Sequence, residues 1–120
     1  MRFDSKNVLI PGAGRGIGCA LAVAFAKEGA FVGCLARTHG EVLSNVEYIQ
    51  SSGGKAEALI SDVSDFDSVS ETISAFGSSR QSIDILFLNA DISVDREKIE
   101  NINPANWKKV VNVNLTSAYY

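Results

Sequence analysis

The chain has 120 residues, which is enough for one domain at most. Hydrophobic residues make up 46% of it and charged residues 21%, a balance typical of globular proteins and not of disordered ones. The net charge of −3 and the pI near 5.0 argue against a nucleic-acid partner, because no basic face is evident. No apolar stretch approaches the roughly 18 residues of a membrane span, and the N-terminus lacks the apolar core of a secretory signal.

The two cysteines favour a reducing compartment. Cys19 falls in a predicted helix and Cys34 in a predicted strand, without a repeat or a C-x-x-C spacing. Such residues are usually small buried side chains, and a metal or redox role is the alternative. We therefore expect buried thiols, no metal site and a cytoplasmic location.

Strand and helix patterns alternate along the first half of the chain. Residues 6–11 read as a buried strand, and 16–29 as a helix that ends on Gly29 as a C-cap. Residues 30–36 are apolar throughout, as expected of a parallel strand that is covered on both faces. Residues 41–52 read as a second helix, which Gly53 and Gly54 end.

The same alternation continues in the second half. Residues 56–61 read as a third strand, 66–79 as a third helix and 83–88 as the most apolar strand, before Asn103-Pro104 opens a last helix that runs to the end. Short right-handed crossovers between such elements predict a doubly wound α/β fold, with a parallel sheet of order 3-2-1-4 and helices on both faces. The strand order reverses between strands 1 and 4, and in such sheets ligands bind at this point, at the carboxyl ends of the strands.

A glycine-rich turn follows the first strand directly. Gly12, Gly16 and Gly18 form a G-x-x-x-G-x-G spacing, whereas G-x-G-x-x-G fails in both frames because Ile17 and Cys19 stand at the third glycine position. A strand, a glycine turn and a helix together present backbone N–H groups and the positive helix end at one point. The turn is therefore predicted to bind a pyrophosphate.

The end of the second strand bears on the choice of cofactor. An acidic residue here would bind the adenosine ribose and select NAD, but the sequence has Arg37 and Thr38 after Ala36. Arg15 lies in the facing turn, and two guanidinium groups suit a ribose 2′-phosphate. We expect NADP in preference to NAD. The alternative is that Arg37 is only a solvated residue after a strand.

Polar residues also follow the third and fourth strands. Asp62, followed by Val63, could accept a hydrogen bond from the adenine amine or could instead cap the helix that starts near Asp65. Asn89 can bind backbone groups of the adjacent loop, and Ala90 leaves room for a ribose.

Two asparagines stand inside the last predicted helix. Asparagine is an indifferent helix former whose side chain competes for backbone hydrogen bonds. Asn114, at a position that we expect to be buried, indicates a structural or catalytic hydrogen-bonding role, whereas Asn112 reads as a plain surface residue.

In the right order at strand ends, these motifs resemble the classical short-chain dehydrogenase/reductase family, and the likeness runs from Lys6 to Tyr120. The resemblance implies a Rossmann-type fold and the NADP-binding, N-terminal half of an oxidoreductase that interconverts alcohols and carbonyls. It assigns the pyrophosphate to the glycines, the adenine to Asp62 and Val63, and the 2′-phosphate to Arg15 and Arg37. By the same resemblance, Asn114 matches the asparagine of the catalytic tetrad. The cofactor-binding set is Gly12, Arg15, Gly16, Ile17, Gly18, Arg37, Thr38, Asp62, Val63, Asn89 and Ala90.

Three departures from the family pattern matter. Pro11 replaces the usual threonine and loses groups that would tie the turn to the fourth strand, and Asp91 replaces a glycine near the expected ribose. In the family the catalytic serine and the Tyr-x-x-x-Lys motif lie beyond Asn114, whereas Tyr119 and Tyr120 precede no lysine and read as packing residues. We therefore expect a truncated domain over residues 1–120 without catalysis of its own.

Three hypotheses follow for the function of the 120 residues. They are a portion of an NADP-dependent enzyme, a non-catalytic dinucleotide-binding or interaction module, or a chain that does not fold alone because its fourth strand is an apolar edge. The substrate would be a small alcohol or carbonyl compound. Homo-oligomers are expected only for a complete enzyme.

Overall fold

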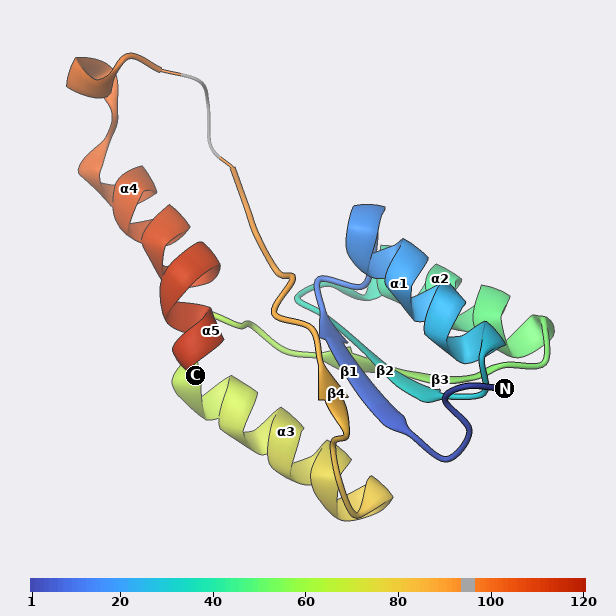
Figure 1. Cartoon of the computed structure of the whole chain (residues 1–120). Coiled ribbons are helices and arrows are strands. Elements are labelled where there is room, and N and C mark those ends of the chain that lie inside the picture. Colours follow the sequence, from blue (N-terminus) through green and yellow to red (C-terminus); the bar gives the residue numbers. More distant parts are fainter. Residues whose placement is uncertain (94–96) are drawn as a thin grey trace.

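Four parallel strands form a single sheet in the order β3-β2-β1-β4 (Figure 1). In the computed structural model, which describes residues 1–93 and 97–120, the strands are β1 (Asn7–Pro11), β2 (Phe31–Ala36), β3 (Lys55–Ile60) and β4 (Ile85–Leu86). The predicted strand order is confirmed. From β1 to β3 the chain adds strands on one side of β1, and it then adds β4 on the other side. A crevice is expected at the carboxyl ends of the strands where this reversal occurs, between β1 and β4.

Helices cover both faces of the sheet, as predicted. Figure 1 shows α1 (Gly16–Lys27) and α2 (His39–Ser51) on one side and α3 (Phe66–Arg80) on the other. Helix α2 begins earlier than predicted, because Thr38 is its extended N-cap residue. After α1 the chain turns at Gly29, whose φ is +92°, in agreement with the predicted glycine end of this helix.

Alternate side chains of the central strand belong to two separate cores. Val8 and Ile10 pack under α1 and α2, whereas Leu9 packs on the α3 side with Leu35 and Phe76. All five side chains are almost completely buried. This alternation follows from the period of two along a strand, and it holds β1 rigidly between the two helical layers.

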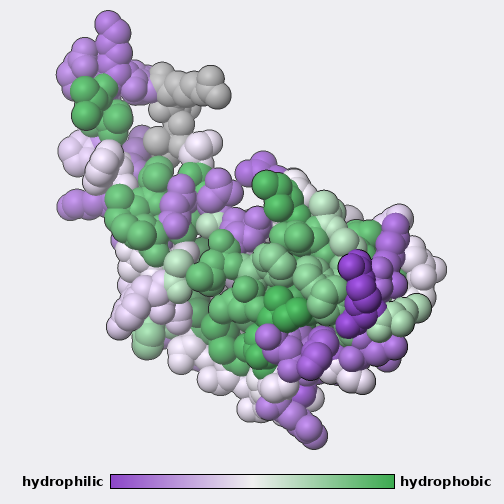
Figure 2. Space-filling model, in the orientation of Figure 1, coloured by the Kyte–Doolittle hydropathy of each residue, from purple (hydrophilic) through white to green (hydrophobic). Residues whose placement is uncertain are grey.

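The fourth strand is shorter than predicted. Only Ile85 and Leu86 form strand pairs with β1, although residues 83–88 read as a strand. This strand has a neighbour on one side only, so the exposed fractions of Leu86 and Leu88 are 46% and 63%. Figure 2 shows hydrophobic residues gathered on this face of the molecule. The apolar composition thus marks an edge here and not a strand buried on both faces.

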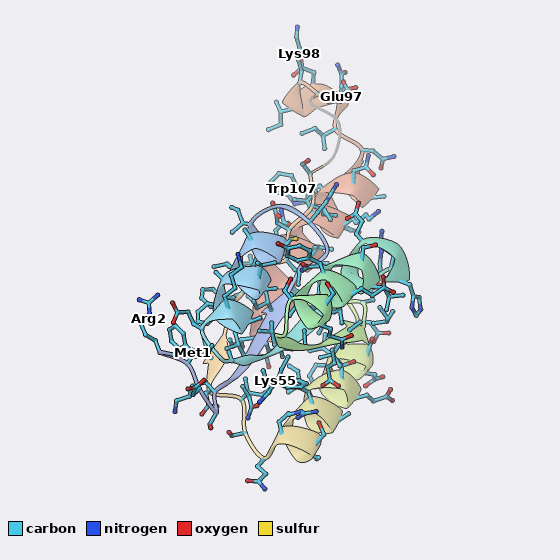
Figure 3. The ribbon with its side chains drawn as sticks, turned by 90° about the vertical axis from the view of Figure 1, so that its right-hand side faces the viewer. Met1, Arg2, Lys55, Glu97, Lys98 and Trp107 are labelled. Carbon is cyan, nitrogen blue, oxygen red and sulfur yellow. The ribbon has the colours of Figure 1, made fainter. Side chains whose placement is uncertain are left out.

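The C-terminal helical segment extends away from the sheet (Figure 1). After the 3₁₀ turn η1 (Ile99–Asn101), helix α4 (Pro104–Val111) begins where Asn103 caps it and continues through the π-helical stretch η2 (Asn112–Thr116) into α5 (Ser117–Tyr119). Trp107 lies on the projecting part, with Glu97 and Lys98 at its tip (Figure 3). The predicted helix is present, but its hydrogen bonding changes near the middle.

Two side-chain expectations need correction. Tyr119 is 86% exposed and is not a packing residue, although the ring of Tyr120 meets that of Phe66 edge-on with centroids 5.4 Å apart. Cys34 is buried as expected, and burial raises the pKa of its thiol to about 12, whereas Cys19 is only half-buried.

Neither a membrane helix nor a metal cluster is found in the part of the chain that the structure describes. None of its helices combines the length and hydrophobicity of a membrane span. No three histidine, cysteine, aspartate or glutamate side chains come together there as a metal site requires.

Gly33 of β2 provides a test of the packing between the sheet and α3. A Cβ at this position would lie 2.7 Å from Cε2 of Phe76 and 3.1 Å from Cδ1 of both Leu9 and Leu59. Gly33→Ala should therefore overpack the core and lower the free energy of unfolding by about 1–3 kcal/mol in urea denaturation. Gly77→Ala is the matched control, because a Cβ there meets no atom within 4 Å and alanine favours the helix by about 0.5–1 kcal/mol. Equal effects of the two substitutions would contradict this packing.

Candidate functional site: a cleft at the carboxyl ends of the strands

A cleft of about 600 Å³ opens at the carboxyl ends of the strands. Its walls come from the turn after β1 and from the segments that follow β2, β3 and β4. It brings together ten of the eleven residues predicted to bind a cofactor: Gly12, Arg15, Gly16, Ile17, Arg37, Thr38, Asp62, Val63, Asn89 and Ala90. The eleventh, Gly18, is buried in the first turn of α1. The residues that follow the four strands therefore line one connected cleft.

Glycine is required at two points of the turn for different reasons. Gly12 has a φ of +74°, and a Cβ there would lie 3.0 Å from both Cα of Ala90 and Nδ2 of Asn89. At Gly18 a Cβ would collide with the carbonyl of Gly12, whose carbon atom would be 2.8 Å away. Gly12 thus allows the chain to reverse against β4, and Gly18 lets α1 pack directly on the end of β1.

The backbone of the turn is anchored to its surroundings on several sides. The N–H groups of Gly12 and Ala13 donate to the carbonyl of Leu35 at 2.8 and 3.2 Å. Nδ2 of Asn89 donates to the carbonyls of Pro11 and Gly12 at 3.1 and 3.3 Å, as predicted for Asn89. The amide of Asn89 therefore connects the turn to the segment after β4, although Pro11 has no backbone N–H to donate.

Helix α1 presents its positive end to the cleft. Arg15 is its N-cap residue and makes no side-chain capping bond, and the first turn contains no acidic residue. The N–H groups of a first helical turn have no partner within the helix. Together with the helix dipole, they form a site suited to an anion.

Three exposed polar side chains line the same cleft as this helix end. Arg15, Arg37 and Thr38 line the same cleft, although they come from the two turns that follow β1 and β2. The hydroxyl of Thr38 does not cap α2. Two cationic groups and a hydroxyl group are thus available to a phosphate in the cleft.

The sequence analysis missed an acidic residue in this group. Glu41 lies in the first turn of α2 and lines the cleft, and its Oε2 would be 3.6 Å from a Cβ built on Gly14. An acidic residue in a first helical turn is a common sequence feature with a purely helical explanation. The sequence position of Glu41 thus carries a signal, but that signal does not distinguish a cleft residue from an ordinary first-turn acid. Asp91, expected near the ribose, lies exposed in the cleft beside Ala90.

Asp62 holds its own loop and does not cap α3. Its Oδ1 accepts hydrogen bonds from the backbone N–H and the hydroxyl of Ser64 at 3.0 and 2.7 Å. The N-cap of α3 is Asp65, so the capping alternative for Asp62 is wrong. The bonds from Ser64, with smaller contributions from the charges of Arg37 and Lys109, lower the pKa of the Asp62 carboxyl group. It therefore enters the cleft as a carboxylate.

Asn114 makes a two-point contact with the loop after β4. Its Oδ1 accepts from the N–H of Ile92 and its Nδ2 donates to the carbonyl of Ile92, both at 2.8 Å. The predicted hydrogen-bonding role is confirmed, but the expected burial is wrong, because Asn114 is exposed within η2. It lines a neighbouring apolar cavity of about 200 Å³ and not the main cleft. Asn112 is exposed, as expected.

Comparison with known proteins identifies the family. The family profile described as short chain dehydrogenase matches residues 6–120. The chain belongs to the short-chain dehydrogenase family. It is 33% identical over 119 residues to a 3beta-hydroxysteroid dehydrogenase of Mediterraneibacter gnavus, covering 99% of the chain and 43% of that protein. It is 31% identical over 120 residues to the 3-oxoacyl-[acyl-carrier-protein] reductase FabG of Buchnera aphidicola, covering 100% of the chain and 48% of that protein.

Solved structures of this family superpose on nearly the whole chain. A metagenomic short-chain oxidoreductase in complex with NADP has a TM-score of 0.95 and 27% identity, with 99% of this chain and 54% of that chain covered. An NAD⁺-bound xylitol dehydrogenase has a TM-score of 0.94 and 25% identity, with 99% and 46% covered. This short-chain dehydrogenase sequence thus spans about half the length of the relatives that it matches.

The loop of Asp62 gives a prediction on pH in this short-chain dehydrogenase. Because the folded-state pKa of Asp62 lies below its unfolded value, the contribution of this group to stability is present above the unfolded pKa and is lost as pH falls through the folded pKa. Ser64→Ala removes the hydroxyl bond and should raise the pKa of Asp62 toward its ordinary value, as followed by NMR titration of its carboxyl carbon. Ser79→Ala is the control, since that hydroxyl bonds the carbonyl of Phe76. An unchanged Asp62 titration in Ser64→Ala would contradict the assignment.

Proposed function

We propose that the cleft binds NADP(H), and that the chain is the cofactor-binding portion of an oxidoreductase that interconverts alcohols and carbonyls by hydride transfer. One observation carries this proposal. The N-terminus of α1, which no side chain caps, lines the same cleft as the side chains of Arg15 and Arg37. A dinucleotide with a ribose 2′-phosphate carries two separate groups of negative charge, and this cleft offers two matching groups of positive charge.

The parts of the cofactor can be assigned along the cleft. The pyrophosphate would lie against the turn from Gly12 to Gly18, where the helix dipole favours negative charge. Adenine would lie beside Asp62 and Val63, with the exocyclic amine donating to the carboxylate. Ala90 would lie along the ribose, where its small side chain leaves space. The remaining lining residues of this proposed set are Ile17, Thr38 and Asn89.

The preference for NADP over NAD rests on the arginines. Guanidinium groups bind phosphate oxygens through two parallel N–H bonds, which a ribose hydroxyl group cannot accept in the same way. Relatives of known structure include both an NADP complex and an NAD⁺ complex, so the family alone does not decide. Glu41 opposes the preference, because its carboxylate lines the same cleft, close to Gly14.

The reaction class is proposed from the family. Two relatives are named as a hydroxysteroid dehydrogenase and an oxoacyl reductase, names that fit the interconversion of alcohols and carbonyls. Residues 1–120 contain no Tyr-x-x-x-Lys motif, so we assign cofactor binding to them and leave proton transfer unassigned. The substrate, the cytoplasmic location and homo-oligomer formation remain predictions.

Substitution of Arg37 tests the 2′-phosphate contact. Loss of a charge-assisted hydrogen bond costs about 1.5–3 kcal/mol, so Arg37→Ala should weaken NADPH binding roughly tenfold to more than a hundredfold. NADH lacks the phosphate and should bind with nearly unchanged affinity. Both affinities can be measured by calorimetry at low ionic strength.

The control for Arg37 is Arg2→Ala, which removes the same charge from an arginine paired with Glu28 at the N-terminus (Figure 3). It should leave both affinities unchanged. Equal losses for NADPH and NADH in Arg37→Ala would rule out the 2′-phosphate contact. Failure of the unmodified chain to bind either dinucleotide would contradict the proposed function itself.

Glu41 gives a prediction of the opposite sign. Neutralising it in Glu41→Gln should remove repulsion toward a 2′-phosphate and tighten NADPH binding by roughly twofold to fivefold at low salt, with a smaller change for NADH. Glu47→Gln makes the same charge change on an exposed position of α2 that does not line the cleft, and it should change neither affinity. Equal changes in the two variants would assign the effect to net charge and not to the position of Glu41.

A further inference from the structure

Helix α2 carries a buried polar side chain on its apolar face. Val42, Val46 and Ile49 are buried against the sheet, and Asn45 lies among them with 6% of its surface exposed. A buried amide without hydrogen bonds costs free energy, and an apolar residue would pack here without that cost. Packing alone therefore does not explain why a polar residue occupies position 45.

The partner of Asn45 is the phosphate-binding turn. Its Nδ2 donates to the carbonyl of Ala13 at 3.0 Å, and Ala13 itself is completely buried. From the other side, Asn89 holds the carbonyls of Pro11 and Gly12. Two side-chain amides, one from α2 and one from the segment after β4, thus engage three successive carbonyl groups of the turn.

The direction of these carbonyls decides what the turn can bind. A carbonyl oxygen that faced the cleft would repel a phosphate, whereas one held by an amide inside the protein leaves the cleft to the N–H groups that follow. The N–H groups of Gly12 and Ala13 are hydrogen-bonded to the carbonyl of Leu35. These bonds leave the orientation of the peptide group after Ala13, and so of its carbonyl, to be fixed by another contact.

We propose that Asn45 is a positioning residue for the pyrophosphate of the cofactor. It acts through the backbone of Ala13 and touches no part of the dinucleotide. The inference rests on the proposed function, and it adds α2 to the elements that shape the phosphate site. Because Glu41 lies one helical turn before Asn45, the same helix also brings a carboxylate to the cleft.

The test compares NADPH with a ligand that keeps the adenosine 2′-phosphate but lacks the pyrophosphate and the nicotinamide riboside attached to it. Asn45→Leu keeps the volume and apolar packing but removes the donor. It should weaken NADPH binding by roughly threefold to tenfold, which corresponds to the loss of one hydrogen bond. Adenosine 2′-monophosphate, which has no pyrophosphate, should bind with less than about a twofold change, measured by NMR titration.

Gln50→Leu is the matched control. Gln50 also lies on α2 and its side-chain amide donates to a backbone carbonyl, that of Ala56 at 2.8 Å, but it does not line the cleft. This variant should leave the affinities for both ligands unchanged, whatever it does to the melting temperature. If Asn45→Leu does not fold, as judged by circular dichroism, Asn45→Ala removes the same donor without added bulk and is read in the same way.

The possible outcomes separate the inference from the function on which it rests. A loss for NADPH alone supports the role of Asn45. Unchanged NADPH binding, or equal losses for both ligands, overturns it while the proposed function stands. If the unmodified chain binds no NADPH, the proposed function fails, and the inference fails with it.

Discussion

The close contact between the start of α1 and the end of β1 is the constraint on which the site depends. Gly18 lies so near the carbonyl of Gly12 that no side chain fits between them. This contact places the positive end of α1 directly over the carboxyl end of the central strand. With a larger separation the N-terminus of α1 would face solvent, where water and salt screen the helix dipole. The anion site is thus a consequence of backbone packing before any charged side chain contributes.

The rigidity of β1 makes that placement reproducible. Val8 and Ile10 are buried under one layer of helices and Leu9 under the other, so the strand cannot rotate without exposing one set. At its end, Leu35 of β2 and Asn89 of the segment after β4 hold the turn. A site whose supports come from several packed elements keeps its geometry better than one on a free loop.

Much of this arrangement could be predicted from the sequence because it depends on local patterns. The strand order follows from alternating β and α segments, and the glycine spacing fixes the turn. The shortness of β4, the exposure of Tyr119 and Asn114, and the incomplete burial of Cys19 could not be predicted in this way. Each depends on which neighbour covers the segment in three dimensions, and hydrophobicity alone does not identify that neighbour.

The roles that we propose for Glu41 and Asn45 could not be predicted from the sequence for a related reason. Both lie on α2 at positions that a helical pattern explains without function, one as a first-turn acid and one as a gap in an apolar face. Their relation to the turn after β1 arises only when α2 packs beside α1, across more than twenty residues of sequence.

The electrostatics of the cleft are a balance between opposing groups. Positive charge in the cleft comes from the N-terminus of α1 and from Arg15 and Arg37. Negative charge in the same cleft comes from three acidic side chains, Glu41, Asp62 and Asp91. The pKa of Asp62 is lowered, so its carboxyl group is a charged carboxylate at neutral pH. Repulsion from the acids weakens with distance and salt, while bonds to backbone N–H groups and guanidinium forks are short and directional. In the proposed binding mode, the phosphates of the dinucleotide would meet the N–H groups and arginines, and its adenine and ribose donors would meet the carboxylates. The mixed charge of the cleft thus favours a ligand with phosphates and hydrogen-bond donors in alternation over a simple polyanion.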